Sequence, residues 1–182
     1  MPITFDITLT TKDMYRFNLY QTYTGFQGLF SIAAGILAFV AAAGSWGSVA
    51  PSRTMLYVFF GVLLLGYMPL TLYVRSKHSI AASEVLKHPL HFSVEEKGFI
   101  VSQKEESACL PWEQIYKMVA TKHNVLVYSS RINAYVIPRE QLGEAYDALA
   151  HLAERKLPAY RLKMKPQKED ESVRENDEGT GI

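Results

Sequence analysis

The chain is poor in cysteine and has no excess of charge of either sign. Its single cysteine, Cys109, excludes an intramolecular disulfide framework and a zinc site built from cysteines. Because Cys109 lies in an apolar strand pattern, we expect a small buried hydrophobic residue rather than a reactive thiol. The 19 Lys and Arg residues balance 18 Asp and Glu residues, so the net charge gives no argument for a nucleic-acid partner.

Charge is also missing from two long segments of the N-terminal half. Asp, Glu, Lys and Arg are absent from the 36 residues Phe17–Ser52 and from the 21 residues Thr54–Val74. Within them, the apolar stretches Phe26–Gly44 and Met55–Val74 would each extend about 30 Å as a helix, the thickness of the hydrocarbon core of a bilayer. The sequence therefore predicts two transmembrane helices, joined as an antiparallel hairpin by the short loop 45–54.

The positive charges around these segments predict their orientation. Lys12 and Arg16 precede the first predicted span, Arg75 and Lys77 follow the second, and the loop between them carries only Arg53. The positive-inside rule places both termini in the cytoplasm. We therefore expect a multi-pass protein of the cell membrane, with the lipid bilayer as its first partner. Neither span contains Asp, Glu, Lys, Arg or His, which argues against a transporter or pump.

Small residues recur every four positions in the first span, at Ala34, Ala38 and Ala42. Such a stripe lets a second helix approach closely. Packing against the second span of the same chain is the preferred interpretation, and the seam of a homo-oligomer is the alternative.

The charged remainder predicts a small domain with strands and helices. Ile3–Leu9 alternates apolar and polar residues, as a half-buried strand does, and it needs a sheet to cover its apolar face. From Leu90 to Ile137, short strands separated by turns indicate an antiparallel meander. A helix from about Pro138 to Leu157, with one apolar face, would close it. The predicted fold class is thus an α+β membrane protein with a two-helix hairpin and one small cytoplasmic sheet. We expect an N-terminal strand (1–11), a hairpin (12–74), a juxtamembrane helix (75–88), a sheet domain (89–157) and a disordered charged tail (158–182).

Two segments of this domain, PWEQIYKMV and NVLVYSSRINAYVIPREQL, carry a family resemblance. The chain resembles the YcxB-like family of small bacterial membrane proteins through Trp112 and Ile115 before a strand, and through Tyr135–Pro138 before the last helix. The resemblance implies a module similar to a pleckstrin-homology domain, a curved sheet capped by one helix, in a bacterial membrane. It brings no established activity and no catalytic residues.

Motifs of catalysis or cofactor binding are not recognised. His88 and His91 have a metal-like spacing, but Pro89 prevents the helical geometry that such a pair needs, and no cysteine or carboxylate cluster lies nearby. The chain has no phosphate-binding loop and no GxGxxG pattern. We therefore expect no enzyme, no metal and no cofactor.

The C-terminal end separates its charges by sign. The six basic residues are Arg155, Lys156, Arg161, Lys163, Lys165 and Lys168, and six acids follow from Glu169 to Glu178. A solvated tail is the first interpretation, and contact of the basic block with anionic lipid is the second. Three functions stay open: a membrane-anchored module that binds a cytoplasmic protein, a lipid-contacting or envelope-sensing protein, and a membrane enzyme with an unrecognised site.

Overall fold

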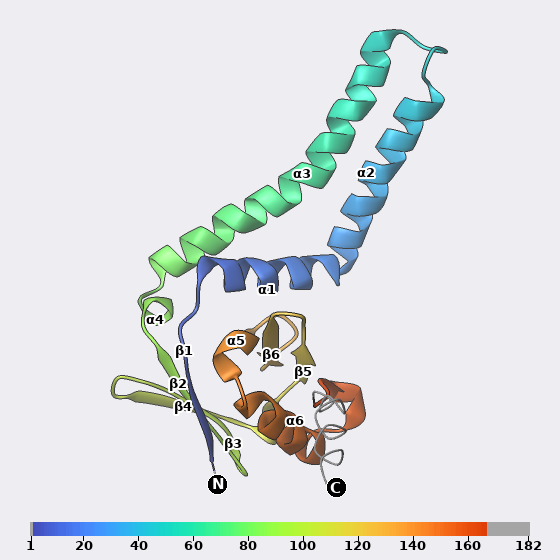
Figure 1. The fold of residues 1–182 in the computed structure, drawn as a ribbon. Helices are drawn as coiled ribbons and strands as arrows, with labels where there is room; N and C mark the ends of the chain where they lie inside the picture. Colours follow the sequence, from blue (N-terminus) through green and yellow to red (C-terminus); the bar gives the residue numbers. More distant parts are fainter. Residues whose placement is uncertain (1, 167–182) are drawn as a thin grey trace, which may run out of the picture.

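A computed structural model describes residues 2–166, which form a pair of sheets and an elongated helical part (Figure 1). The helices are α1 (Thr11–Tyr23), α2 (Phe26–Gly44), α3 (Pro51–Ala82), α4 (Glu84–Lys87), α5 (Arg139–Leu142) and α6 (Ala145–Lys156). Short 3-10 turns span Trp112–Gln114 and Ala159–Arg161. The strands are β1 (Ile3–Ile7), β2 (Leu90–Glu95), β3 (Gly98–Gln103), β4 (Glu106–Pro111), β5 (Lys117–Ala120), β6 (Asn124–Tyr128), β7 (Ala134–Pro138) and β8 (Leu162–Lys163).

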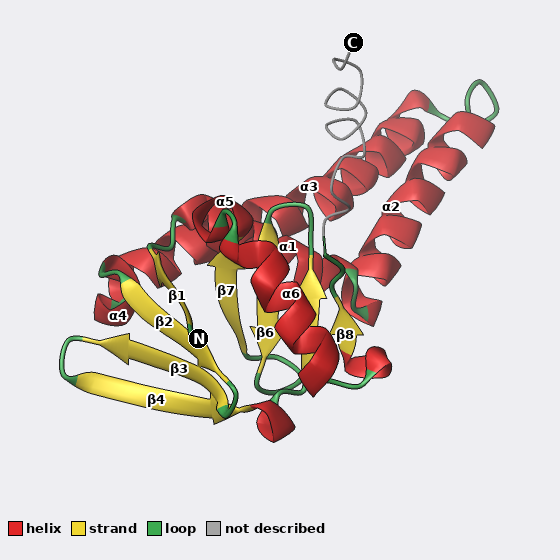
Figure 2. Cartoon of the chain, turned by 60° about the horizontal axis from the view of Figure 1, so that its bottom comes forward, coloured by secondary structure: helices red, strands yellow, loops and turns green. Residues whose placement is uncertain are grey.

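The strands form two four-stranded sheets, in the orders β1-β2-β3-β4 and β7-β6-β5-β8. Neighbouring strands are antiparallel, except that β8 pairs in parallel with β5. In Figure 2 the two sheets lie side by side, and α6 crosses in front of the β7-β6-β5-β8 sheet. The sequence predicts a single antiparallel sheet closed by one helix. The structure confirms the mixture of helices and strands, but it has two sheets with a shared core.

The apolar core lies between the two sheets, α6 and α1. Trp112 and Ile115 belong to it, and the Trp112 Nε1 group donates a hydrogen bond of 2.9 Å to the carbonyl oxygen of Glu95. Both residues carry the family resemblance, and their burial agrees with a packing role. Leu149 and Tyr146 on the inner face of α6 are also buried, as the spacing of apolar residues in that helix predicts.

The first strand of the chain is completed by residues far along the sequence. β1 pairs with β2, so that Ile3 lies opposite Val94 and Phe5 opposite Phe92, although four helices separate the two strands in the chain. The rings of Phe5 and Phe92 stack with their centroids 5.4 Å apart. This is the sheet partner that the alternation of the N-terminal residues requires.

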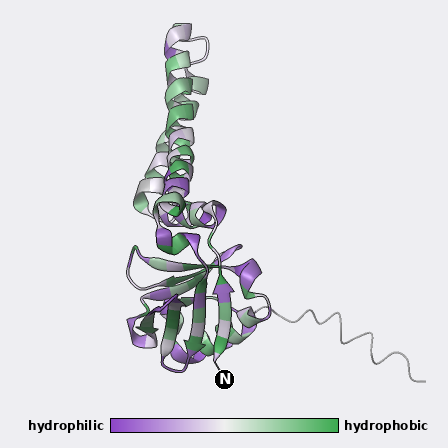
Figure 3. Ribbon diagram, turned by 90° about the vertical axis from the view of Figure 1, so that its left-hand side faces the viewer, coloured by the Kyte–Doolittle hydropathy of each residue, from purple (hydrophilic) through white to green (hydrophobic). Residues whose placement is uncertain are grey.

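The helical part projects from the sheets as the antiparallel pair α2 and α3 (Figures 1 and 3). Within the described residues, α3 by itself is long and apolar enough to cross a membrane. A second crossing is reached only if α1 and Gly28–Gly44, which meet at 76°, count as one bent span. The predicted membrane character is therefore supported by one helix, and the predicted second span depends on this bent pair. α3 also extends through most of the predicted juxtamembrane helix before it breaks at Ser83.

The alanine stripe of α2 lies in the packed region of the hairpin. Ala42 is buried, and Ala34 and Ala38 are half-buried. Between them, a Cβ atom added to Gly35 would stand 2.6 Å from Leu65 Cγ of α3, which is closer than real contacts allow. Small residues thus let α2 and α3 approach each other within one chain.

Three details of the sheet domain differ from the sequence-based expectation. The closing helix is divided into α5 and α6, because Gly143 adopts φ +51°, a conformation that ends a helix. Cys109 is exposed rather than buried, because its strand β4 lies at a sheet edge and presents Glu106–Cys109 to solvent.

The third difference concerns the predicted disordered tail. Ala159–Lys163 instead continues the fold as a 3-10 turn and the strand β8, and Met164 is buried in the core. A short parallel pair gave no periodic signal in the sequence, so burial of Met164 was not foreseen. Residues 167–182 of the predicted tail, including its acidic block, lie outside the described residues.

Candidate functional site: the junction of helices and sheets

The helix α1 lies between the projecting helices and the sheets. It contacts α3 on one side and the strands β6 and β7 on the other (Figure 1). Phe17 is buried, and its ring centroid lies 6.4 Å from that of Tyr128 in β6. Burial raises the pKa of Tyr128 to about 12, so its hydroxyl stays protonated. α1 therefore packs against both α3 and the strands β6 and β7.

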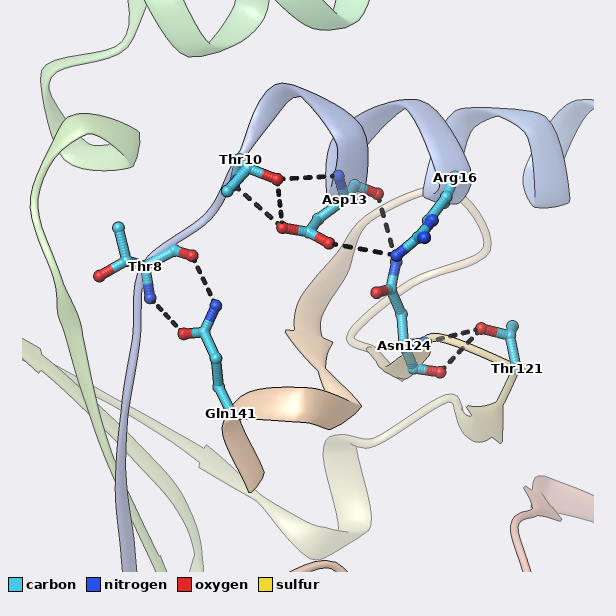
Figure 4. Close-up of polar contacts among 7 residues, drawn as sticks. All are labelled: Thr8, Thr10, Asp13, Arg16, Thr121, Asn124 and Gln141. Carbon is cyan, nitrogen blue, oxygen red and sulfur yellow. Dashed lines mark hydrogen bonds and ion pairs between the residues drawn. The ribbon is translucent and has the colours of Figure 1, made fainter. Parts of the chain in front are cut away.

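A capping box fixes the start of α1 (Figure 4). The Thr10 hydroxyl donates to the Asp13 carboxylate over 2.6 Å, and the Thr10 backbone N–H donates to the same oxygen over 3.1 Å. In return, the Asp13 backbone N–H donates to the Thr10 hydroxyl over 3.3 Å. A threonine followed three residues later by an acid is the spacing that such a cap requires. The nearby Arg16 guanidinium lies 3.9 Å from the buried Asp13 carboxylate.

Asn124, at the start of β6, joins the sheet to this capped end. Its side-chain amide donates to the backbone carbonyl of Asp13 over 3.2 Å, and Thr121 exchanges two hydrogen bonds with its backbone. Asn124 is 1% exposed, and its Oδ1 atom has no partner within the described residues. Nearby, the Gln141 side chain forms two hydrogen bonds with the backbone of Thr8, at 2.8 and 2.9 Å (Figure 4). Asn124 and Gln141 cannot be singled out from the sequence, since single amides mark no motif.

The opposite side of α1 is bonded to α3. The Asn18 side-chain amide donates to the Ser76 hydroxyl over 2.8 Å, and that hydroxyl donates to the Leu72 carbonyl over 2.7 Å. Ser76 is fully buried. Polar bonds on both faces of α1 therefore hold the sheets and α3 in one arrangement.

The structure separates the residues of the predicted basic block, Arg155, Lys156, Arg161, Lys163, Lys165 and Lys168. Lys156 forms an ion pair with Glu96 in the β2–β3 turn. Arg161 donates to the carbonyl oxygens of Glu113 and Ile115, at 3.4 and 3.3 Å. Arg155 is exposed at the end of α6, and Lys168 lies outside the described residues. Within the described residues, Lys156 and Arg161 therefore have partners in the fold.

Lys163 and Lys165 instead line a cleft together with residues that the sequence did not single out. The cleft has a volume of about 720 Å³ and lies between the β5–β6 turn, α6 and β8. Lys122 and Arg139 also line it. Because these four residues come from three separate stretches of the chain, only the fold brings them together.

The histidines of the predicted metal-like pair are placed at the start of β2. The His91 Nδ1 atom lies 2.7 Å from an Asp6 carboxylate oxygen on the paired strand β1, and both side chains are exposed. Across residues 2–166, no group of three or more His, Cys, Asp or Glu side chains is arranged to hold a metal ion.

The fold and the junction define a protein in which a helical part, with one helix long and apolar enough to cross a membrane, is inserted between two strands of a sheet. Residues 94–153, from β2 to α6, match the model of a family described as YcxB-like protein. The match confirms the resemblance and identifies this part of the chain as YcxB-like. No curated protein and no solved structure matches the chain.

Proposed function

We propose that the chain is a membrane-anchored, non-enzymatic module that presents a pleckstrin-homology-like domain to a cytoplasmic protein. In this proposal α2 and α3 both cross the membrane, and the two termini and both sheets lie in the cytoplasm. The observation that carries it is the insertion of the helices between β1 and β2 of one sheet. A domain built around its anchor is held at a fixed position, whereas a domain on a linker is not.

The distribution of charge supports this orientation. Lys12 and Arg16 lie on α1, and Arg75 and Lys77 lie near the end of α3, so positive side chains gather at the sheet side of the helical pair. The far end of the pair carries only Arg53. The projecting helices are rich in hydrophobic residues (Figure 3), and many of these side chains are exposed, as contact with lipid requires.

The edge strand β4 is the surface that best suits a protein partner. It is the outer strand of its sheet, and Glu106–Cys109 are exposed (Figure 2). Unpaired backbone groups of an edge strand can accept an added strand from another protein. No Lys or Pro interrupts β4 before Pro111, so the edge carries little protection against such pairing.

Photo-crosslinking in native membranes tests this proposal. A photoreactive residue in place of Ser107 on β4 is expected to give a defined protein adduct. The matched control is the same residue in place of Glu144, which is equally exposed but lies between α5 and α6. No adduct from position 107, or the same adducts from both positions, would contradict the use of the β4 edge.

The two other functions receive less support. Lipid contact through residues 155–168 would have to compete with the ion pair of Lys156 and the backbone contacts of Arg161. No observation in the described residues favours a membrane enzyme.

A further inference from the structure

The cleft beside β8 gathers positive charge that the proposed function does not use. Lys122 lies in the β5–β6 turn, Arg139 begins α5, and Lys163 and Lys165 lie in and just after β8. Within residues 2–166, none of the three lysines forms an ion pair. Among the residues that the structure describes, Glu154 is the one acid that lines the cleft. The lining therefore carries four positive charges against one negative charge.

The arginine of the cleft is held in a fixed place. The Arg139 guanidinium lies 4.2 Å from the ring centroid of Tyr146, and one of its nitrogens donates to the Thr121 carbonyl over 3.4 Å. Its backbone N–H donates to the His123 carbonyl over 2.8 Å. A guanidinium has five N–H donors, so most of those of Arg139 stay available to an anion.

The same contacts position the lysines. The Tyr146 hydroxyl donates to the backbone carbonyl of Lys165 over 3.0 Å, and the pairing of β8 with β5 fixes Lys163 beside Val119. An arrangement formed before binding loses less conformational entropy when a ligand arrives.

The neighbourhood of the cleft is also electropositive. Partial burial lowers the pKa of His123, next to Lys122, and the positive charges of Arg16 and Lys122 lower it further. His123 is therefore largely neutral near pH 7, and the surrounding field favours a negative ligand.

Apolar side chains form the rest of the cleft wall. Leu157 and Met164 are buried at its base, and Leu162 is half-buried beside them. An apolar wall makes no favourable contact with a small inorganic anion, but it can bury the hydrocarbon part of a larger molecule.

We propose that the cleft formed by Lys122, Arg139, Lys163 and Lys165 binds the phosphate group of a phosphate ester, whose organic part rests on the apolar wall. Phosphate suits the planar fork of an arginine and the point charges of lysines. The ester comes either from a lipid headgroup or from a soluble metabolite, since both present the same phosphate. This inference does not depend on the proposed protein partner at the β4 edge.

Calorimetric titration tests this proposal by measuring the affinity of the full chain, in a neutral detergent and phosphate-free buffer, for three probes. The probes are inorganic phosphate, phenyl phosphate and a short-chain phosphatidic acid. We expect at least one ester to bind more tightly than inorganic phosphate. Binding of phenyl phosphate alone assigns a soluble source, and binding of phosphatidic acid alone assigns a lipid source. If both esters bind, the tighter of the two assigns the source. Each of these results supports the cleft as a phosphate-ester site.

A triple variant, with Gln at Lys122, Lys163 and Lys165, is expected to weaken ester binding by about tenfold or more, because three charge-assisted contacts are lost. These three lysines are exposed, so the fold should persist. A control triple, with Gln at the exposed residues Lys97, Arg131 and Arg155, removes the same charge elsewhere and should retain binding within about twofold. No ester binding by the unmodified chain, or equal losses in the two triples, would overturn the proposal.

Discussion

Asn18 of α1 donates a hydrogen bond of 2.8 Å to the hydroxyl of Ser76, a fully buried residue of α3. The same α1 accepts a hydrogen bond at the Asp13 carbonyl from Asn124 of β6, over 3.2 Å. One short helix is thus bonded to the membrane-type helix on one side and to a sheet on the other. The position of the sheet domain relative to α3 follows from these contacts.

Replacing Ser76 by Ala is expected to loosen this junction. The variant leaves the Asn18 amide without its acceptor, which should lower the free energy of unfolding by about 1 kcal/mol. Thermal unfolding of the full chain in detergent would measure the change. Ser52→Ala, at an exposed position of the same helix, is the control and should change nothing. Equal stability of the two variants would show that the bond to Asn18 is dispensable.

The pairing of β1 with β2 predicts that the N-terminus stabilises the sheet domain. Phe5→Asp places a charge in the core beside Phe92 and should cost about 3 kcal/mol or more. Limited proteolysis of the sheet domain should then be faster. Thr4→Asp adds the same charge to the exposed face of β1 and should leave the rate unchanged. Unchanged proteolysis of the Phe5 variant would mean that β1 contributes nothing to the domain.

Gly98 is required at the start of β3. Its φ of +150° is rarely adopted by other residues, and an added Cβ atom would stand 2.7 Å from Pro111 Cα on the paired strand β4. Gly98→Ala should therefore destabilise the domain by about 1–3 kcal/mol. Gly44→Ala, where an added Cβ meets no atom within 4 Å, is the control for urea unfolding. A Gly98 variant as stable as the control would contradict this role.

His123 should make stability depend on pH. Because burial and then Arg16 and Lys122 lower its pKa in the folded chain, the unfolded chain takes up a proton first as the pH falls. Above the ordinary histidine pKa the ring is neutral in both states, and the folded chain keeps its full stability. This stability is lost as the pH falls toward and through the lower pKa of His123 in the folded chain. His123→Gln should therefore lose less stability than the unmodified chain between pH 7 and 5. Identical pH profiles would contradict the shift.

Helices and strands with a periodic pattern of apolar residues could be predicted from the sequence. Elements whose position depends on contacts between distant residues could not. Alternation in Ile3–Leu9 and the apolar face of the closing helix both correspond to elements of the fold. β8 has only two residues and no period, and its place depends on the pairing with β5. Cys109 was expected to be buried, because an apolar strand pattern does not reveal which strand lies at an edge.

The candidate sites were harder to predict than the fold. The Thr10–Asp13 cap is local and could be recognised from spacing, whereas Asn124 reaches Asp13 across 111 positions of the chain. The basic block was visible as a run of charge, but ion pairing of Lys156 and backbone contacts of Arg161 divide it. The cleft that replaces it as a candidate needs Lys122 and Arg139, which only the tertiary structure brings near β8.

The central claim is that the helical pair crosses the membrane twice and that both sheets lie in the cytoplasm. The most direct test is to label two cysteines with a membrane-impermeant maleimide in intact bacterial cells. One protein carries only the native Cys109, which is exposed on β4, and the other carries Ser48→Cys together with Cys109→Ser. We expect position 48 to be labelled in intact cells and Cys109 to be labelled only after permeabilisation. Labelling of Cys109 in intact cells, or protection of position 48 until permeabilisation, would contradict the proposed topology.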